Sequence, residues 1–155
     1  MMEATLEIST DKARLDKGFI HAYLSNESYW ARGRTMEEVQ RSLDHSLCFG
    51  AYLPGGKQVA FARVITDKVA FAWLMDVFVA PEARGKGIGK KLIAQITGHE
   101  DLQQVNGIGL RTEDAHGLYR TFGFAEIPKA HTWMLRANPN TQSSLSVDRE
   151  TNKND

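Results

Sequence analysis

Residues 79–97 read VAPEARGKGIGKKLIAQIT and are the most informative part of the chain. Apolar residues recur there at helical spacing, which predicts a helix over residues 87–97 with Gly98 as its stop. These apolar residues are Ile88, Leu92, Ile93 and Ile96. The preceding residues are typical of a strand that ends at Val79. The chain therefore passes from a strand, through a glycine-rich turn, into a helix.

The glycine-rich turn has the features of a phosphate site. Its glycines let the backbone approach a ligand closely, and the unpaired N–H groups of a helix start favour negative charge. Basic residues surround the turn, namely Arg84, Lys86, Lys90 and Lys91. We interpret the segment as a pyrophosphate site, with a plain turn carrying solvated basic side chains as the alternative. The spacing fits neither the Rossmann fingerprint nor the P-loop.

The rest of the chain predicts an α+β domain. Working outward, we expect strands at residues 5–9, 47–53, 58–65, 69–79 and 107–112, one after the Gly123-Phe124 turn, and a last one at residues 131–136. Helices are expected from an Asp11 N-cap to about Leu24, from the Thr35/Glu38 capping box to about His45, and over residues 114–122. The three strands from 47 to 79 form an antiparallel meander, and the helix at 87–97 crosses over to a parallel strand.

Composition limits the classes of protein to which the chain can belong. Its 155 residues fit one domain, which we place at residues 1–136. In the polar tail, residues 137–155, Leu145 and Val147 are the only large apolar residues, so we expect disorder there. A formal net charge of zero gives no support to a nucleic-acid partner. Cys48 is the single cysteine, and its apolar neighbours favour a buried small hydrophobe over a nucleophile.

Two motifs together resemble a known family. Val79-x-Pro81-x-x-Arg84-Gly85-x-Gly87-x-Gly89 is similar to the acetyl-CoA motif of the GCN5-related N-acetyltransferases (GNAT family). Ala115-x-x-x-Tyr119-x-x-x-Gly123-Phe124 is similar to that family's downstream motif. The resemblance is strong from about Leu47 to Arg136. It implies a mixed, mainly antiparallel sheet flanked by helices, whose strands at 69–79 and 107–112 splay apart to admit the pantetheine arm.

The resemblance also implies a set of cofactor-binding residues. Acetyl-CoA is the implied co-substrate, with its pyrophosphate on the amides of the glycine-rich turn and its pantetheine amides near Val77 and Val79. The full set is Val77, Phe78, Val79, Arg84, Gly85, Lys86, Gly87, Ile88, Gly89, Lys90, Thr112 and Tyr119. Thr112 stands where many family members have Asn, and its hydroxyl can still donate a hydrogen bond.

The implied reaction needs a base and an acid. An alkyl amine is protonated at pH 7, and removing its proton costs on the order of 4 kcal/mol. Asp76, flanked by apolar residues, is the candidate base, and a structural hydrogen-bonding role is the equal alternative. Glu113 and His116 are secondary candidates for a water-mediated relay. The resemblance places Tyr119 near the thioester sulfur, where its phenol would protonate the departing thiolate, and the amide of Val79 could hold the oxyanion.

Acceptor recognition is expected where the first two helices meet the open sheet. The candidates are Tyr29, Trp30, Arg32, Arg34, Trp73 and Asp76. Aromatic faces can hold an ammonium or aryl group, and arginines can pair with a carboxylate. Ordinary packing with arginines extended to solvent is the alternative, which we favour for Arg34.

Together these features predict an acetyl-CoA-dependent N-acetyltransferase. We favour a small-molecule amine as the acceptor over a protein or peptide amine, and a catalytically silent acyl-CoA-binding sensor is the competing hypothesis. We expect no metal, since the histidines lack ligand spacing, and no membrane partner, since apolar runs fall far short of about 20 residues. We expect a cytoplasmic protein. The sequence leaves the oligomeric state open, a homodimer included.

Overall fold

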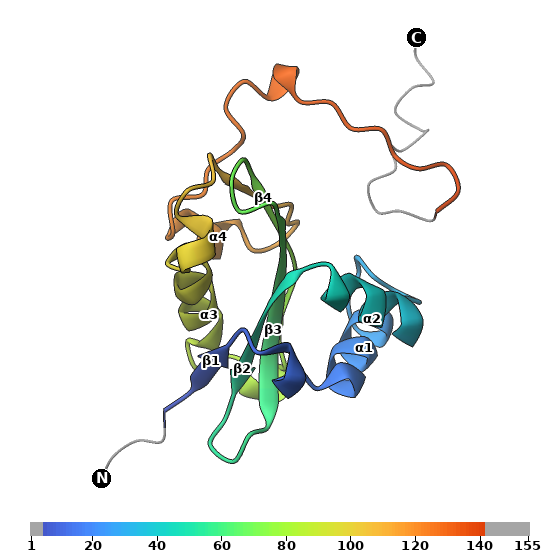
Figure 1. The fold of residues 1–155 in the computed structure, drawn as a ribbon, viewed down its shortest axis with the longest axis vertical. Helices are drawn as coiled ribbons and strands as arrows, with labels where there is room; N and C mark the ends of the chain where they lie inside the picture. The colour runs from blue at the N-terminus through green and yellow to red at the C-terminus, as the bar shows by residue number, and fades with distance from the viewer. Residues whose placement is uncertain (1–4, 142–155) are drawn as a thin grey trace. The chain divides into compact units, whose positions relative to one another are not determined.

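The computed structural model describes residues 5–141, which fall into two compact units divided after Phe124 (Figure 1). The strands are β1 (Glu7–Ser9), β2 (Leu47–Tyr52), β3 (Gln58–Thr66), β4 (Ala72–Val79) and β5 (Ile108–Gly109). The α-helices are α1 (Lys17–Asn26), α2 (Met36–Asp44), α3 (Ile88–Thr97) and α4 (His116–Arg120). Short 3-10 helices are η1 (Lys12–Arg14), η2 (Pro81–Ala83), η3 (Glu100–Leu102) and η4 (Ala130–Thr132).

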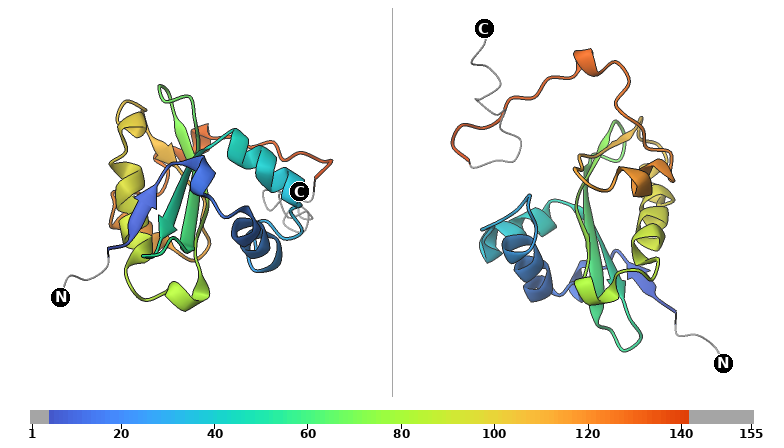
Figure 2. Two further views of the ribbon diagram at one scale, coloured as in Figure 1. Left: turned by 60° about the horizontal axis from the view of Figure 1, so that its bottom comes forward. Right: turned by 180° about the vertical axis from the view of Figure 1, so that it is seen from behind.

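The first unit is a five-stranded sheet with helices on both faces, which confirms the predicted fold class. The strand order is β1-β2-β3-β4-β5, antiparallel except for the parallel pair β4–β5. Helices α1 and α2 cover one face, and α3 and α4 cover the other (Figures 1 and 2). Each face has its own apolar cluster: Ile20, Val39 and Phe78 pack under α1 and α2, and Leu74, Leu92 and Ile96 pack under α3.

The parallel pair opens as the prediction required. Ala72 pairs with Ile108 and Trp73 with Gly109, and the registered pairing ends there. β4 continues to Val79, so most of its length has no neighbour on the β5 side. Over most of β4, the backbone groups that face this opening pair with no other strand among the described residues.

A β-bulge interrupts β4 at its centre. Phe61 pairs with Phe78 and Arg63 pairs with Met75, so one extra residue is accommodated on β4 between these pairs. Asp76 lies in this stretch, with a left-handed φ of 55°. Asp tolerates this conformation better than most residues because its short polar side chain can hydrogen-bond locally. The bulge was not apparent from the sequence.

The bulge changes which side chains of β4 face which helices. Before it, Leu74 belongs to the cluster under α3; after it, Phe78 belongs to the cluster under α1 and α2. Strict alternation from Leu74 would direct Asp76 towards α3. The extra residue instead lets Asp76 reach the face of α1 and α2, where its hydrogen-bond partners lie.

The N-terminal helix begins later than predicted. Asp11 caps η1, through its contact with the Ala13 N–H, and Asp16 caps α1 through the Phe19 N–H. Leu15 between them is extended, with φ −66° and ψ 130°, so one continuous helix cannot form. The predicted capping box of α2 is confirmed, with Thr35 and Glu38 bonding reciprocally.

The two predicted C-terminal strands are wrong. In the second unit, residues 125–136 contain the 3-10 helix η4 and no strand. Pro128 has no N–H to give to a sheet, and Lys129 has a left-handed φ of 55°, so the chain turns where a strand was expected. Residues 142–155 of the predicted disordered tail lie outside the described residues, and the domain boundary at Arg136 stays a prediction.

Candidate active site

The glycine-rich turn forms the N-terminus of α3. Gly85 and Gly87 both have φ of 78°, a conformation that glycine adopts without strain. The first bond of the helix runs from the Lys91 N–H to the Gly87 carbonyl at 3.2 Å. The three N–H groups before Lys91 therefore have no acceptor within the helix, and no side chain caps them in the part of the chain that the structure describes. These are donors for an anion.

The surroundings of the turn fit a diphosphate. A Cβ placed on Gly85 or Gly87 would meet no protein atom within 4 Å, so both backbones face open space. Lys86, Lys90 and Lys91 are exposed around them, while Ile88 is buried and fixes the start of the helix. Backbone donors, glycine access and positive charge thus coincide at one place, as a coenzyme A diphosphate would need.

Arg84 has a more specific placement than a solvated side chain. Its Nε donates to the carbonyl oxygen of Val79 at 3.1 Å, and its Nη2 donates to the Tyr23 hydroxyl at 2.8 Å. Tyr23 in turn stacks on Phe78, with ring centroids 4.0 Å apart. Arg84 therefore ties the glycine-rich turn to the end of β4 and to α1.

The end of β4 directs backbone groups of Val79 into the opening. The Ala80 N–H donates to the Val59 carbonyl at 2.8 Å, and Ala60 is opposite Val79. Because hydrogen-bonded and non-hydrogen-bonded pairs alternate, the N–H and carbonyl of Val79 face away from β3. Val77 and Val79 are half-buried against the cluster under α3. The Phe78 side chain is buried on the opposite face, and its backbone pairs with Phe61.

Tyr119 is a buried phenol on α4. Its ring meets the edge of Phe124 at a centroid distance of 5.7 Å, and its carbonyl accepts the N–H groups of Phe122 and Phe124. Burial, with smaller effects of Tyr29 and Asp114, raises the pKa of Tyr119 to about 12. The phenol therefore keeps its proton at neutral and mildly alkaline pH and can act as a proton donor.

Two loops meet beside the opening. The N–H of Glu113, in the loop after β5, donates to the Tyr29 hydroxyl at 3.2 Å. Thr112 in the same loop accepts the Ala115 N–H at 3.1 Å, which leaves its hydroxyl proton free to donate. The side chains of Glu113 and His116 are exposed. The Tyr29 contact joins the α1–α2 loop to the loop that carries Thr112.

Asp76 is the centre of a buried polar cluster. Its side chain is 0% exposed and accepts from Trp30 Nε1 at 2.8 Å, Arg34 Nη1 at 2.6 Å and Arg63 Nε at 2.6 Å. Arg63 also donates to the Ser46 hydroxyl at 3.1 Å. Both carboxylate oxygens are engaged, and no surface remains through which an acceptor amine could approach. The geometry therefore favours the structural alternative for Asp76.

Sequence reasoning did not single out Arg63. The signal was present, because Arg63 is the one charged residue between apolar neighbours in Val59–Ile65. Arg34, for which extension to solvent was favoured, instead makes an ion pair with Asp76. The structure thus adds Arg63 to the candidate functional residues and gives Arg34 a partly buried ion pair in place of a solvated role.

The remaining acceptor candidates are less closely connected. Tyr29 is exposed and meets Trp30 edge-on, with ring centroids 5.0 Å apart. Trp73 is half-buried over β5, where a Cβ on Gly109 would be 2.8 Å from its ring. Arg32 is exposed. The structure thus joins Tyr29, Trp30 and Asp76, and leaves Arg32 and Trp73 outside the cluster.

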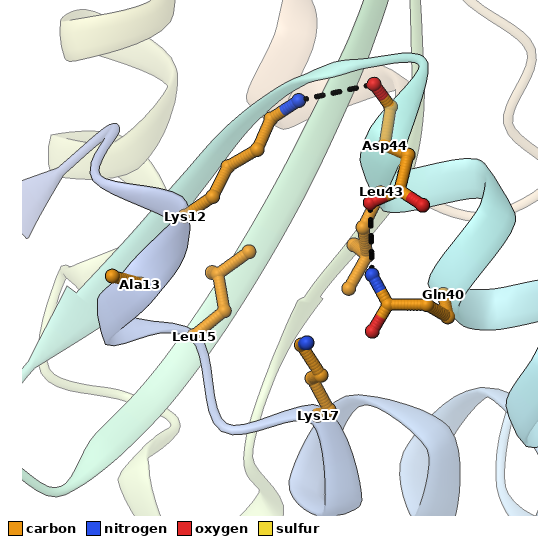
Figure 3. A pocket seen from close by; sticks show the side chains of 7 residues that line it. All are labelled: Lys12, Ala13, Leu15, Lys17, Gln40, Leu43 and Asp44. Atoms are coloured by element: carbon orange, nitrogen blue, oxygen red, sulfur yellow. Dashed lines mark hydrogen bonds between the residues drawn. The ribbon is translucent and has the colours of Figure 1, made fainter.

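A cavity of about 250 Å³ lies between the start of α1 and the end of α2 (Figure 3). Its lining residues are Lys12, Ala13, Leu15, Lys17, Gln40, Leu43 and Asp44. Lys12 Nζ donates to the Asp44 carbonyl at 3.3 Å, and Gln40 donates to the Asp44 carboxylate at 2.9 Å. No predicted site residue lines this cavity, so it is separate from the candidate active site.

Other predictions concern reactive and metal-binding groups. Cys48 is buried, and burial raises the pKa of its thiol to about 11, which confirms the predicted apolar role. Over residues 5–141 the structure places no three His, Cys, Asp or Glu side chains together as a metal site. None of the helices described is long and apolar enough to cross a membrane.

Comparison with known proteins identifies the family. A family model for the acetyltransferase (GNAT) domain matches residues 44–126. A crystal structure of a GNAT-family protein from Xanthomonas campestris pv. campestris, described as an acetyltransferase, is 46% identical with a TM-score of 0.84, and the match covers 89% of this chain and 96% of that one. The chain therefore belongs to the GNAT family of acetyltransferases.

Two curated relatives are also similar in sequence. A protein of Gibberella zeae described as an acetyltransferase is 32% identical over 104 residues, 56% of this chain and 59% of that protein. Serotonin N-acetyltransferase 2, chloroplastic, of Oryza sativa subsp. japonica is 35% identical over 102 residues, 63% of this chain and 51% of that protein. The chain thus spans between half and three-fifths of the length of these two relatives.

Proposed function

We propose that this chain transfers the acetyl group of acetyl-CoA to the primary amine of a small molecule. The observation that carries the proposal is the N-terminus of α3, where unpaired N–H groups, two left-handed glycines and exposed lysines coincide. Such a site suits the diphosphate of coenzyme A. An aminoglycoside N-acetyltransferase of the same fold, with a TM-score of 0.66 and 16% identity, was crystallised with CoA.

The opening between β4 and β5 is the proposed place of the reaction. Acetyl-CoA supplies an acetyl thioester, which is activated towards amines. On this chain the Val79 N–H faces the opening and can stabilise an oxyanion, while the Tyr119 phenol holds a transferable proton on Oη. The acceptor amine enters from the side of α1 and α2, where Tyr29 and Trp30 lie.

A small acceptor is favoured by the aromatic side chains at this entrance. Tyr29 and Trp30 are edge-on to each other, so their rings are available to contact an apolar or cationic molecule. The curated rice relative is named for serotonin, a small amine, and the structural neighbour crystallised with CoA is named for aminoglycosides. We carry this class of acceptor over to the present chain as part of the proposal.

Calorimetry and a turnover assay test the proposal together. We expect CoA and acetyl-CoA to bind with similar affinity and to be displaced by neither ATP nor NAD. Thiol release from acetyl-CoA across a panel of small amines and lysine peptides should be fastest with a small amine. Failure of folded protein to bind CoA would refute the proposal. Binding without turnover on every amine would favour a sensor, and faster turnover with peptides would favour a protein acceptor.

A further inference from the structure

We propose that the acceptor amine also carries a carboxylate and that Arg34 binds it. This inference rests on the proposed function, because it specifies the acceptor of the same site. Its starting point is the cluster of Asp76 with Arg34 and Arg63, in which two guanidinium groups share one carboxylate. One positive charge of this cluster is therefore not neutralised within it.

The excess charge is poorly hydrated, which makes it a binding feature. The side chains of Asp76, Arg63 and Arg34 are only 0%, 7% and 19% exposed. Uncompensated charge at partly buried positions is costly, and an anionic ligand relieves that cost. Two carboxylates follow Arg34 closely in the chain: Glu37 pairs with Arg41, and Glu38, which feels the charge of Arg34, is exposed and occupied by the α2 capping box. Neither substitutes for a ligand.

Arg34 has the free edge that a carboxylate requires. Its Nη1 is bound to Asp76, whereas its Nε and Nη2 donate to no group among the described residues. These two nitrogens form a planar fork that matches the two oxygens of a carboxylate. Arg34 is the most exposed member of the cluster, so it is the member that a ligand can reach. Asp76, which also accepts from Trp30, holds the Arg34 guanidinium in place.

The position of the cluster sets the size of the acceptor. Asp76 and Val79 are three residues apart on β4, and because the bulge at Asp76 shortens the strand, they are separated by at most about 10 Å. The Val79 N–H faces the opening where the amine would react. An acceptor whose amine and carboxylate are separated by less than this distance can occupy both sites. That description fits an amino acid or a similar small amino carboxylate.

Matched pairs of acceptors test the inference. The acceptors are several α- and ω-amino acids, and each is compared with its own carboxamide by measuring kcat/KM with acetyl-CoA. We expect the wild-type protein to prefer the carboxylate over the carboxamide by about 10- to 100-fold, as a bidentate charged hydrogen bond provides. Arg34→Gln should reduce this preference to within about 3-fold, and Arg34→Lys, which keeps the charge without the fork, should be intermediate. Arg41→Gln is the matched control, because Arg41 is 75% exposed on α2, and it should keep the preference.

A binding measurement by NMR tests the inference even if no acceptor is turned over or if Arg34→Gln does not fold. The indole N–H resonance of Trp30, assigned with Trp30→Phe, should shift on titration with amino acids and not with their carboxamides, and Arg34→Lys should weaken the response. Equal responses to both members of a pair, no response to either, or a preference that survives Arg34→Gln would overturn the inference. If acetyl-CoA binds and the carboxamides react as well as the amino acids, the proposed function stands and this inference fails. If acetyl-CoA does not bind, the proposed function fails, and the Trp30 titration then decides only whether Arg34 binds a carboxylate.

Discussion

Asp76 combines a left-handed backbone with a carboxylate that accepts three hydrogen bonds. The sequence marked it as unusual, because a charged residue interrupts an apolar strand, and left the roles of base and structural acceptor equal. Alternation along a strand could not predict its partners, because the bulge redirects its side chain to the opposite face. Its environment depends on residues from the α1–α2 loop and from β3 that are distant in sequence.

Tyr119 is the residue for which the chemistry is easiest to test. We expect Tyr119→Phe to lower kcat by about 100-fold, because general acid catalysis of this kind contributes about 10²–10⁴-fold. The KM for acetyl-CoA should change by less than about 3-fold, since the phenol acts on the leaving group. Steady-state kinetics measure both values.

Tyr52→Phe is the matched control for that substitution. Tyr52 is buried on β2, and its hydroxyl has no hydrogen-bond partner among the described residues. Losing this hydroxyl should leave kcat unchanged. An unaltered kcat in Tyr119→Phe would remove Tyr119 from the mechanism, whereas a similar loss in both variants would indicate a general effect of tyrosine substitution.

The buried phenol of Tyr119 also predicts a pH dependence of stability. Burial raises its pKa from 10.0 to about 12, so the folded chain holds this proton more tightly than the unfolded chain does. The resulting stabilisation is complete below about pH 10 and is lost as the pH rises towards 12. The free energy of unfolding should therefore decline more steeply above pH 10 in the wild-type protein than in Tyr119→Phe. Parallel declines in urea titrations would contradict this assignment.

At the scale of elements, the turn before α3 was predictable because the residues within it, rather than distant contacts, determine its backbone conformation. Glycines at 85 and 87 permit left-handed φ, and the apolar spacing of the following residues forms the helix. The sequence thus placed the anion site without knowledge of the rest of the fold. It did not predict that Arg84 joins this turn to Tyr23 of α1.

Gly87→Ala tests the turn as an element. A left-handed conformation costs a non-glycine residue about 1–2 kcal/mol, so we expect the free energy of unfolding to fall by about 1 kcal/mol. The added methyl also occupies the open space before the helix, so acetyl-CoA should bind about 10-fold more weakly, equivalent to about 1.4 kcal/mol. Urea unfolding and calorimetry measure the two effects.

Gly117→Ala provides the comparison within the same molecule. Gly117 lies in α4, and a Cβ there also meets nothing within 4 Å, but its φ is not left-handed. Alanine is favoured over glycine in a helix by about 0.5–1 kcal/mol, so this variant should be as stable as the wild type or more so. If both variants weaken acetyl-CoA binding equally, the argument from Gly87 fails.

At the scale of the whole molecule, the end of the chain is the part that the sequence predicted least well. Apolar residues at 131–136 suggested a strand, but a strand needs a partner for its backbone groups, and the residues around Lys129 form a turn instead. Hydrophobic pattern alone could not reveal that residues 131–136 form no strand.

Shortening the chain to end at Arg136 tests the expected domain boundary. The 19 residues removed, 137–155, contain Leu145 and Val147 as their only large apolar residues, and this composition predicts that they bury little apolar surface. We expect the midpoint of thermal unfolding to change by less than about 2 °C, which corresponds to well under 1 kcal/mol. The affinity for acetyl-CoA should be unchanged. A drop of about 5 °C or more would show that the tail contributes to the folded domain.

The sequence by itself determined the features that are local. The glycine turn, the helix after it, the meander and the Thr35/Glu38 capping box follow from neighbouring residues, whose spacing and conformational limits act over a few positions. Tertiary structure alone decided which distant side chains meet. The bulge of β4 brings Asp76 to Trp30, Arg34 and Arg63, and the opening beyond Trp73 exposes the end of β4. Those contacts depend on strand register, which no local pattern fixes when a bulge shifts it by one residue.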